Sequence, residues 1–173
     1  MRRKLTSGHA FVALGANIPF GDEQPVDTLR RAMAALIPLS RHLPILSGIY
    51  ESDPKDCPPG SPVYLNAVVA ILPRDDEPLA LLHKLQAIEQ RFGRQRSGIV
   101  NESRTLDLDL LAFGGVEMDT PELTLPHPRA HERRFVLQPW LEIAGHDWVL
   151  KGRTLGEWLL DCQDPPLCRL QDY

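Results

Sequence analysis

The sequence has few cysteines, no long apolar run and no excess of positive charge. Its 173 residues include three cysteines, Cys57, Cys162 and Cys168, an odd number without metal-type spacing. Neither a disulfide framework nor a zinc site is therefore indicated, and the reducing cytoplasm is the expected compartment. No stretch approaches the roughly 20 apolar residues of a membrane-spanning helix. The formal net charge of −4 argues against non-specific nucleic-acid binding. We expect no nucleic-acid, membrane or obligate protein partner.

The basic residues are unevenly distributed, although the chain is acidic overall. Arginines gather on both sides of one short acidic stretch: Arg91, Arg94, Arg96 and Arg104 precede it or open it, and Arg129, Arg133 and Arg134 follow it. A local arginine cluster in an acidic protein indicates a small anionic ligand. The alternative is a basic surface patch.

The acidic stretch, residues 104–111, reads Arg-Thr-Leu-Asp-Leu-Asp-Leu-Leu. Apolar and acidic residues alternate here, which is typical of a strand with two unlike faces, so Asp107 and Asp109 should share one face. Paired carboxylates suit Mg²⁺, which takes one or two of them and completes its shell with waters and phosphates. Arg104 is placed to bind phosphate charge. The alternative is a solvated edge strand whose outer face is acidic.

Periodicity and turn residues predict the order strand, helix, strand, strand, helix, strand. The expected elements are strands at 9–14, 45–51 and 64–72, a helix opening at Pro25, a helix at 77–92 and the acidic strand. A short strand at 123–125, a helix at 133–143 and a short helix after the capping box Thr154–Glu157 follow. This is the ferredoxin-like split βαβ pattern.

We therefore predict an α+β fold, with a ferredoxin-like βαββαβ core and a C-terminal extension of short strands and helices. The core should span about 9–145 within a single domain covering 1–173, and the tail after about 162 should be irregular.

Two predicted elements carry further candidate binding residues. Tyr64 and Asn66 share a strand face, and an aromatic ring beside an amide suits a planar heterocycle. The alternative is a core tyrosine and a strand-end asparagine. Gln86 and Glu89 are neighbours on a helix surface, where a solvated face is the default.

Taken in order, five segments of this chain resemble 6-hydroxymethyl-7,8-dihydropterin pyrophosphokinase, the enzyme of folate biosynthesis. They are Ala13-Leu14-Gly15-Ala16-Asn17, Tyr64-Leu65-Asn66-Ala67, Glu89 with Gly93-Arg94-Gln95-Arg96, Arg104-Thr105-Leu106-Asp107-Leu108-Asp109, and Pro126-His127 followed by Arg133 and Phe135. Each segment alone is a weak signal. Their common order and spacing extend the resemblance over roughly Phe11 to Ile143.

The resemblance implies transfer of the diphosphoryl group of ATP to the hydroxymethyl oxygen of the pterin, with release of AMP. Asp107 and Asp109 would hold two Mg²⁺ ions that bridge ATP and pterin. The implied catalytic residues are Arg94, Arg96, Arg104, Asp107 and Asp109. The implied ATP-binding residues are Gln86, Glu89, Arg96, Arg104, Leu110, Thr124, His127 and Arg133. The implied pterin-binding residues are Gly15, Ser52, Asp53, Tyr64, Asn66 and Phe135, with the pterin stacked between Tyr64 and Phe135.

The polar connection 94–103 is a predicted lid. It contains Gly98 and offers few apolar contacts that would hold it in the empty protein. Closure would exclude water and bring Arg94 and Arg96 onto the transferring group. Asn101 stands where the family often has a tryptophan, and Glu102 where it usually has glycine. Ser52-Asp53-Pro54 replaces a Thr-Pro-Pro segment at one wall of the pterin pocket.

Two other functions fit parts of the sequence. A catalytically idle relative would bind nucleotide or pterin in a regulatory role, but the retained aspartates and arginines argue against it. A ferredoxin-like interaction module would leave unexplained the combination of Arg104, Asp107, Asp109 and His127.

Overall fold

The computed structural model describes residues 5–75, 77–95, 98–100 and 102–171. At its centre is an antiparallel sheet with the strand order β10-β3-β4-β1-β5, and β2 also pairs with β4. The strands of this sheet are β1 Ala10–Ala16, β2 Ile45–Leu46, β3 Tyr50–Ser52, β4 Tyr64–Ile71, β5 Asp107–Phe113 and β10 Cys168–Arg169. The order β3-β4-β1-β5 is that of a ferredoxin-like sheet, which confirms the predicted α+β fold.

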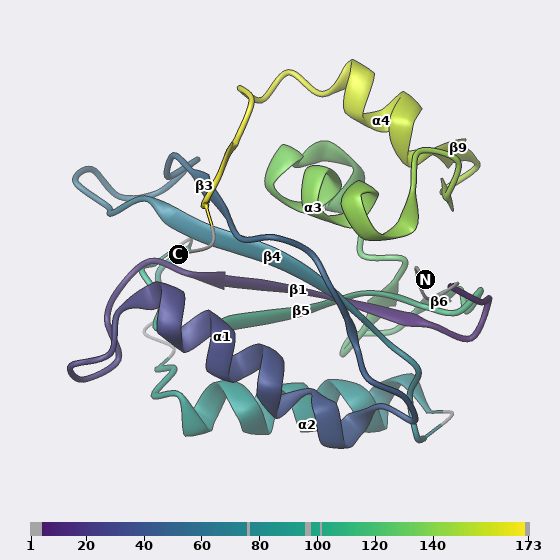
Figure 1. Cartoon of the computed structure of the whole chain (residues 1–173), viewed down its shortest axis with the longest axis horizontal. Coiled ribbons are helices and arrows are strands. Elements are labelled where there is room, and N and C mark those ends of the chain that lie inside the picture. The colour runs from purple at the N-terminus through teal and green to yellow at the C-terminus, as the bar shows by residue number, and fades with distance from the viewer. Residues whose placement is uncertain (1–4, 76, 96–97, 101, 172–173) are drawn as a thin grey trace.

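Helices cover both faces of the sheet. Helices α1 (Pro25–Ala35) and α2 (Pro78–Arg91) lie on one face, and α3 (Arg134–Ala144) lies on the other with α4 (Leu155–Asp161) packed against it (Figure 1). Helices α1 and α2 both begin at a proline, whose missing N–H costs nothing at a first helical position. Within the described ranges no helix is long and apolar enough to cross a membrane.

Short elements complete the chain. They are the 3-10 turns η1 Ile37–Leu39 and η2 Ala130–Glu132, the hairpin of β6 Met118–Asp119 with β7 Thr124–Leu125, and the hairpin of β8 Val149–Leu150 with β9 Arg153–Thr154. The predicted capping box is confirmed at the start of α4. The Glu157 amide donates to Thr154 Oγ1 at 3.2 Å, and the Thr154 amide donates to Glu157 Oε2 at 2.8 Å.

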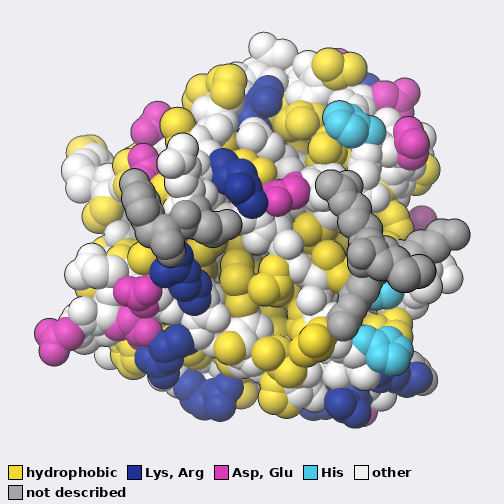
Figure 2. Space-filling model, viewed as in Figure 1, with side chains coloured by type: hydrophobic (Ala, Val, Ile, Leu, Met, Phe, Trp, Pro, Cys, Tyr) yellow, Lys and Arg dark blue, Asp and Glu magenta, His cyan; other side chains and the backbone are white. Residues whose placement is uncertain are grey.

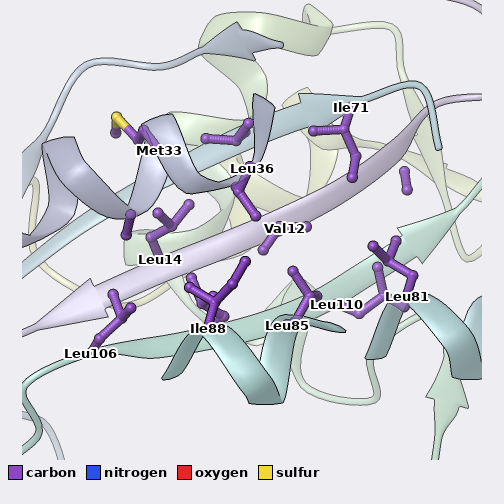
Figure 3. Packing of buried hydrophobic residues seen from close by; sticks show 14 of the residues in the cluster. Val12, Leu14, Met33, Leu36, Ile71, Leu81, Leu85, Ile88, Leu106 and Leu110 are labelled. Atoms are coloured by element: carbon purple, nitrogen blue, oxygen red, sulfur yellow. The ribbon is translucent and has the colours of Figure 1, made fainter. Parts of the chain in front are cut away.

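The alternation in β5 separates the apolar core from the candidate site. Leu106, just before β5, and Leu108 and Leu110 within it point toward α1 and α2, where they pack with Val12, Leu14, Met33, Leu36, Ile71, Leu81, Leu85 and Ile88 (Figure 3). Burying one such side chain contributes roughly 1.5–3 kcal/mol. A second cluster that includes Phe11, Val68 and Trp140 fills the space between the sheet and α3. Asp107 and Asp109 therefore face the α3 side.

The strand predicted at 45–51 is interrupted. It forms β2 and β3, with Ser47 and Gly48 between them. The Ser47 hydroxyl accepts from the Val68 amide at 2.9 Å, and the Gly48 amide donates to Glu142 of α3 at 3.0 Å. A carboxylate from another element thus takes a donor that would otherwise pair along the strand.

The prediction of an irregular tail is partly wrong. Cys168 and Arg169 form β10 against β3, and the Leu170 amide donates to Ile49 O at 2.8 Å. The β3 edge offers unpaired backbone groups, and the returning chain satisfies them. The first strand also runs further than the predicted 9–14, because β1 continues through Ala16.

Candidate active site

Two arginines hold Asp107 in a fork. Arg94 Nη1 donates to Oδ1 of Asp107 at 2.6 Å, and Arg104 Nη1 donates to Oδ2 at 2.5 Å. Arg104 precedes β5, whereas Arg94 follows α2. The Arg94 contact therefore connects the end of α2 to β5. Two of the arginines that cluster around the acidic stretch in the sequence therefore place their positive charge directly beside Asp107.

Asp109 lies in a different electrostatic environment. Burial, reinforced by the negative charges of Asp107 and Glu89, raises the pKa of Asp109 to about 7. Its carboxylate makes no hydrogen bond to the described residues, which also contain no cluster of three or more His, Cys, Asp or Glu side chains suited to a metal ion. A divalent cation at the pair would relieve the repulsion and favour the ionised form. The donor set of two carboxylates, completed by water and phosphate oxygens, fits Mg²⁺.

Glu89 is buried rather than solvated, contrary to the default expectation for a polar pair on a helix. Only 3% of the residue is exposed. Its Oε1 accepts from the Leu108 amide at 2.7 Å and from Arg94, and burial raises the pKa of Glu89. The carboxylate thus joins α2 to β5. Glu89, Gln86 and Arg94 line a hollow beside α2 together with Gln90, which the sequence reasoning did not select.

Arg104 is held by Asn17, a residue to which the sequence reasoning gave no role. The Asn17 side-chain oxygen accepts from the Arg104 amide at 2.7 Å, and the Asn17 amide donates to Arg104 O at 3.1 Å. Its side-chain nitrogen also donates to Ser103 Oγ at 3.2 Å. Asn17 directly follows β1, so this network fixes the entry to β5. The sequence feature that could have indicated a role for Asn17 is its place in Ala13-Leu14-Gly15-Ala16-Asn17, one of the five segments that resemble the family.

One cavity on the α3 side of the sheet brings together the predicted pterin-binding residues and the acidic pair. Gly15, Ser52, Asp53, Tyr64, Asn66 and Phe135 line it, along with Arg104, Asp107, Asp109 and Arg133. Lys55, Cys57 and Arg129 also line it, although none was a predicted site residue. Lys55 and Cys57 lie in the loop after β3, whose proline, glycine and charged residues are those of an ordinary surface loop.

The polar edge of this cavity is ordered by Asn66, which is 5% exposed. Its Nδ2 donates to Ser52 Oγ at 2.8 Å and to Tyr50 O at 3.2 Å, while its Oδ1 makes no hydrogen bond to any described residue. The Tyr64 hydroxyl donates to Glu102 O at 3.1 Å, and burial, followed by the proximity of Cys57, raises the Tyr64 pKa to about 12. The neutral phenol of Tyr64 and the side-chain carbonyl of Asn66, which can accept a hydrogen bond, therefore belong to the lining of the same cavity.

The remaining predicted ATP-binding residues are more dispersed. Leu110 is packed in the core and is 3% exposed. Thr124 donates to Asp119 at 3.0 Å and lines a third hollow with Met118 and Pro126. The His127 amide donates to Leu111 O at 2.8 Å. Burial, with the charge of Arg133 nearby, lowers the His127 pKa to about 4.

Arg96 and Asn101 lie outside the described residues, so their roles remain predictions. The described ends of the predicted lid are both anchored: Arg94 contacts Glu89 and Asp107, and Ser103 contacts Asn17.

Lys and Arg side chains elsewhere on the face in Figure 2 are scattered among acidic and apolar ones. The cavity, by contrast, combines Arg104, Arg129 and Arg133.

This arrangement can bind a polyanion next to a flat heterocycle. Arginine side chains recognise phosphate oxygens, and an aromatic pair with a polar edge recognises a planar ring. No nucleophilic side chain is required when the acceptor is an alcohol on the bound heterocycle, because such transfers depend on positioning and charge stabilisation.

Comparisons with known proteins identify relatives of this chain. The family model for 7,8-dihydro-6-hydroxymethylpterin-pyrophosphokinase matches residues 11–145. A Haemophilus influenzae protein named 2-amino-4-hydroxy-6-hydroxymethyldihydropteridine pyrophosphokinase is 42% identical over 142 residues, covering 82% of this chain and 84% of the relative. The Pseudomonas aeruginosa protein of the same name is 39% identical over 154 residues, covering 88% and 90%.

Solved structures show the same fold at low identity. The wild-type HPPK-DHPS of Plasmodium falciparum with pteroate has a TM-score of 0.64 at 13% identity, over 88% of this chain and 42% of the other. An HPPK-DHPS in complex with substrates has a TM-score of 0.63 at 13% identity, over 88% and 43%. This chain thus spans less than half of those longer proteins. With the family model matching most of its length, the chain belongs to the 7,8-dihydro-6-hydroxymethylpterin-pyrophosphokinase family.

Proposed function

We propose that this pyrophosphokinase of folate biosynthesis transfers the diphosphoryl group of ATP to the hydroxymethyl oxygen of 6-hydroxymethyl-7,8-dihydropterin, with two Mg²⁺ ions held by Asp107 and Asp109. The observation that carries the proposal is the single cavity shared by the acidic pair, the arginines and the Tyr64–Phe135 pair. An alcohol acceptor on the pterin and a triphosphate on the arginines would meet beside the aspartates.

The chain's own residues bind and orient the triphosphate. Arg104 and Arg133 line the cavity, and their charges are placed to stabilise the negative charge on the transferring group. Asp107 and Asp109 would hold Mg²⁺, which would supply positive charge to offset the negative charge of the triphosphate. Arg104 already contacts Asp107, so binding would redistribute an existing charge network.

Tyr64 and Phe135 are the proposed walls of the pterin site. The free Asn66 Oδ1 would accept from an N–H on the ring edge, because its Nδ2 is already committed to Ser52 and Tyr50. Arg133 lies over the Phe135 ring at 5.6 Å, which ties the phosphate-binding side to the pterin-binding side.

The compartment and partners follow from the same proposal. The substrates are small molecules, and Cys57, Cys162 and Cys168 are free thiols, which supports the cytoplasm as the site of action. We propose no nucleic-acid, membrane or obligate protein partner.

The proposed reaction is tested by an assay for AMP release from ATP in the presence of the hydroxymethyl pterin, with and without Mg²⁺. AMP should form only when both substrates and the metal are present. Asp107→Ala and Asp109→Ala should each abolish turnover while the circular-dichroism spectrum is unchanged. Asp27→Ala is the matched control, because this exposed carboxylate pairs with Arg30 on α1. Normal turnover in either site variant at saturating Mg²⁺ would end the two-metal proposal.

The pterin site is tested by calorimetry with pterin and with a non-hydrolysable ATP analogue. Tyr64→Ala and Phe135→Ala should weaken pterin binding far more than nucleotide binding, each ring contributing on the order of 1 kcal/mol beyond its buried area. Tyr64→Phe keeps the ring and loses only the bond to Glu102, so it should retain most pterin affinity. Equal losses for both ligands would show that the rings serve the core instead.

A further inference from the structure

The segment after α4 lies beyond the matched range 11–145 and returns to the cavity side of the molecule. In Figure 1 this yellow segment leaves α4 and descends to the edge of the sheet beside β3. It is anchored there by the β10 pairing and by Arg169, which contacts Glu142 of α3 at 3.4 Å. Between α4 and β10 it passes the start of α3.

Asp164 makes several of the polar contacts of this segment, and Cys162 O accepts a further bond from Arg134 Nη2 at 3.2 Å. Asp164 Oδ1 accepts from Lys55 Nζ at 2.5 Å, and its Oδ2 accepts from the Arg134 amide at 3.1 Å. Its carbonyl oxygen accepts from Arg134 Nε at 2.8 Å. The Asp164 side chain is only 15% exposed, so these bonds are partly shielded from water.

The two partners of Asp164 belong to different walls of the cavity. Lys55 lies in the loop after β3 and lines the cavity itself. Arg134 is the first residue of α3 and stands between Arg133 and Phe135, which line the cavity from the other side. Asp164 is not among the described residues that line the cavity. Any effect of Asp164 on a ligand there must act through its partners.

We propose that Asp164 is a positioning residue that sets the width of the proposed pterin site. Its carboxylate connects Lys55 in the loop after β3 to the Arg134 amide at the start of α3, and we call this pair of contacts the clasp. This inference rests on the proposed function, because it takes the cavity as the pterin site. Asp164 itself does not line the cavity, so it is not proposed to contact the ligand. It fixes Lys55 and the backbone beside Phe135 relative to each other.

The electrostatics of the clasp are favourable at both contacts. A carboxylate at a helix N-terminus interacts favourably with the partial positive charge of the exposed amides. Burial alone would raise the Asp164 pKa, but the bonds from Lys55 and the Arg134 amide lower it below its ordinary value. The carboxylate is therefore ionised at neutral pH. The separate β10 and Arg169 contacts should keep the tail docked when Asp164 is replaced.

Asp164→Ala removes both side-chain bonds and leaves the backbone bond to Arg134 in place. We expect pterin affinity to fall about five- to tenfold and nucleotide-analogue affinity to stay unchanged, as measured by calorimetry on the full chain. Asp164→Asn loses the ionic partner of Lys55 but keeps an acceptor for the Arg134 amide, so its loss should be smaller. Asp161→Asn is the matched control, because Asp161 is an exposed carboxylate at the end of α4 that pairs with Arg153 of β9.

A double-mutant cycle separates the clasp from direct contact by Lys55. If Lys55 acts through Asp164, Lys55→Met should weaken pterin binding less in the Asp164→Ala background than in the wild type. Equal losses for pterin and nucleotide that follow the loss of melting temperature would overturn the proposal in favour of a general structural role. Unchanged pterin affinity in an active enzyme would overturn it too.

Hydrogen exchange in the ligand-free chain tests the clasp without any substrate. Asp164→Ala should speed exchange in 53–57 and at the first amides of α3, and Asp161→Asn should not. Unchanged exchange at both places overturns the clasp. A wild-type chain that releases no AMP from ATP and pterin would instead refute the proposed function, and exchange would still decide whether Asp164 joins the two walls.

Discussion

Arg94 Nη1 donates to Asp107 Oδ1 at 2.6 Å and so joins the end of α2 to the first residue of β5. The same guanidinium contacts Glu89, a buried carboxylate that also accepts from the Leu108 amide. Arg94 thus has two negative partners before any ligand binds. A cation at Asp107 and a triphosphate nearby would compete with both contacts, so Arg94 is expected to exchange partners during the reaction cycle.

Arg94→Ala should reduce the single-turnover rate of AMP formation more than it reduces ATP affinity. In the empty chain it also leaves Glu89 buried without its cation, so the free energy of unfolding should fall by about 2–3 kcal/mol. Rapid-quench kinetics and urea titration measure the two effects. Arg91→Ala, an exposed arginine in the last turn of α2, serves as the control. Equal effects in the two variants would contradict the role of the Arg94 contacts.

The raised pKa of Asp109 predicts a pH dependence of stability in the ligand-free chain. Between its ordinary value of 3.8 and about 7, the folded chain retains a proton that the unfolded chain has released. Stability should therefore fall as pH rises through this interval, and Asp109→Asn should remove that part of the slope. Urea titrations of both proteins at several pH values provide the measurement. An identical slope in the variant would contradict the assignment.

His127 should titrate far below an ordinary histidine. Its pKa of about 4, compared with 6.5 for a free side chain, means that only the unfolded chain gains a proton as pH falls through this interval. The stability contributed by neutral His127 is accordingly lost on acidification from about pH 6.5 towards 4. A bound triphosphate should raise its pKa, because negative charge favours the imidazolium. NMR titration of His127 with and without a nucleotide analogue measures this shift. No shift at His127 would place the nucleotide elsewhere.

Gly15 lies between Asn66 and Asp107 in the sheet register and lines the cavity. A Cβ at this position would come no closer than 3.9 Å to Leu65 O, so the fold tolerates alanine. Gly15→Ala should therefore preserve or slightly raise the melting temperature and yet weaken pterin binding, because the methyl occupies space that the ligand needs. Gly115→Ala is the control, since a Cβ there meets no atom within 4 Å. Calorimetry with full pterin affinity in Gly15→Ala would show that the ligand does not approach this strand.

The sequence alone determined the features that depend on local spacing. Alternation at Leu106, Leu108 and Leu110 was enough to assign Asp107 and Asp109 to the opposite face, because side chains in a strand alternate whatever surrounds them. The capping box at Thr154 and the proline starts of α1 and α2 are likewise local. Family motifs then supplied the candidate roles, which the experiments above are designed to test.

Tertiary structure decided everything that depends on residues distant in the chain. Only the packed fold brings Glu89 into the interior beside Leu108, holds Arg104 with Asn17 and raises the pKa of Asp109. Desolvation and charge proximity are properties of the assembled site, and no spacing pattern encodes them. The same holds for the returning tail. Asp164 reads in the sequence as one carboxylate in an irregular segment, and it gains its two partners only because α3 and the loop after β3 come together beside it.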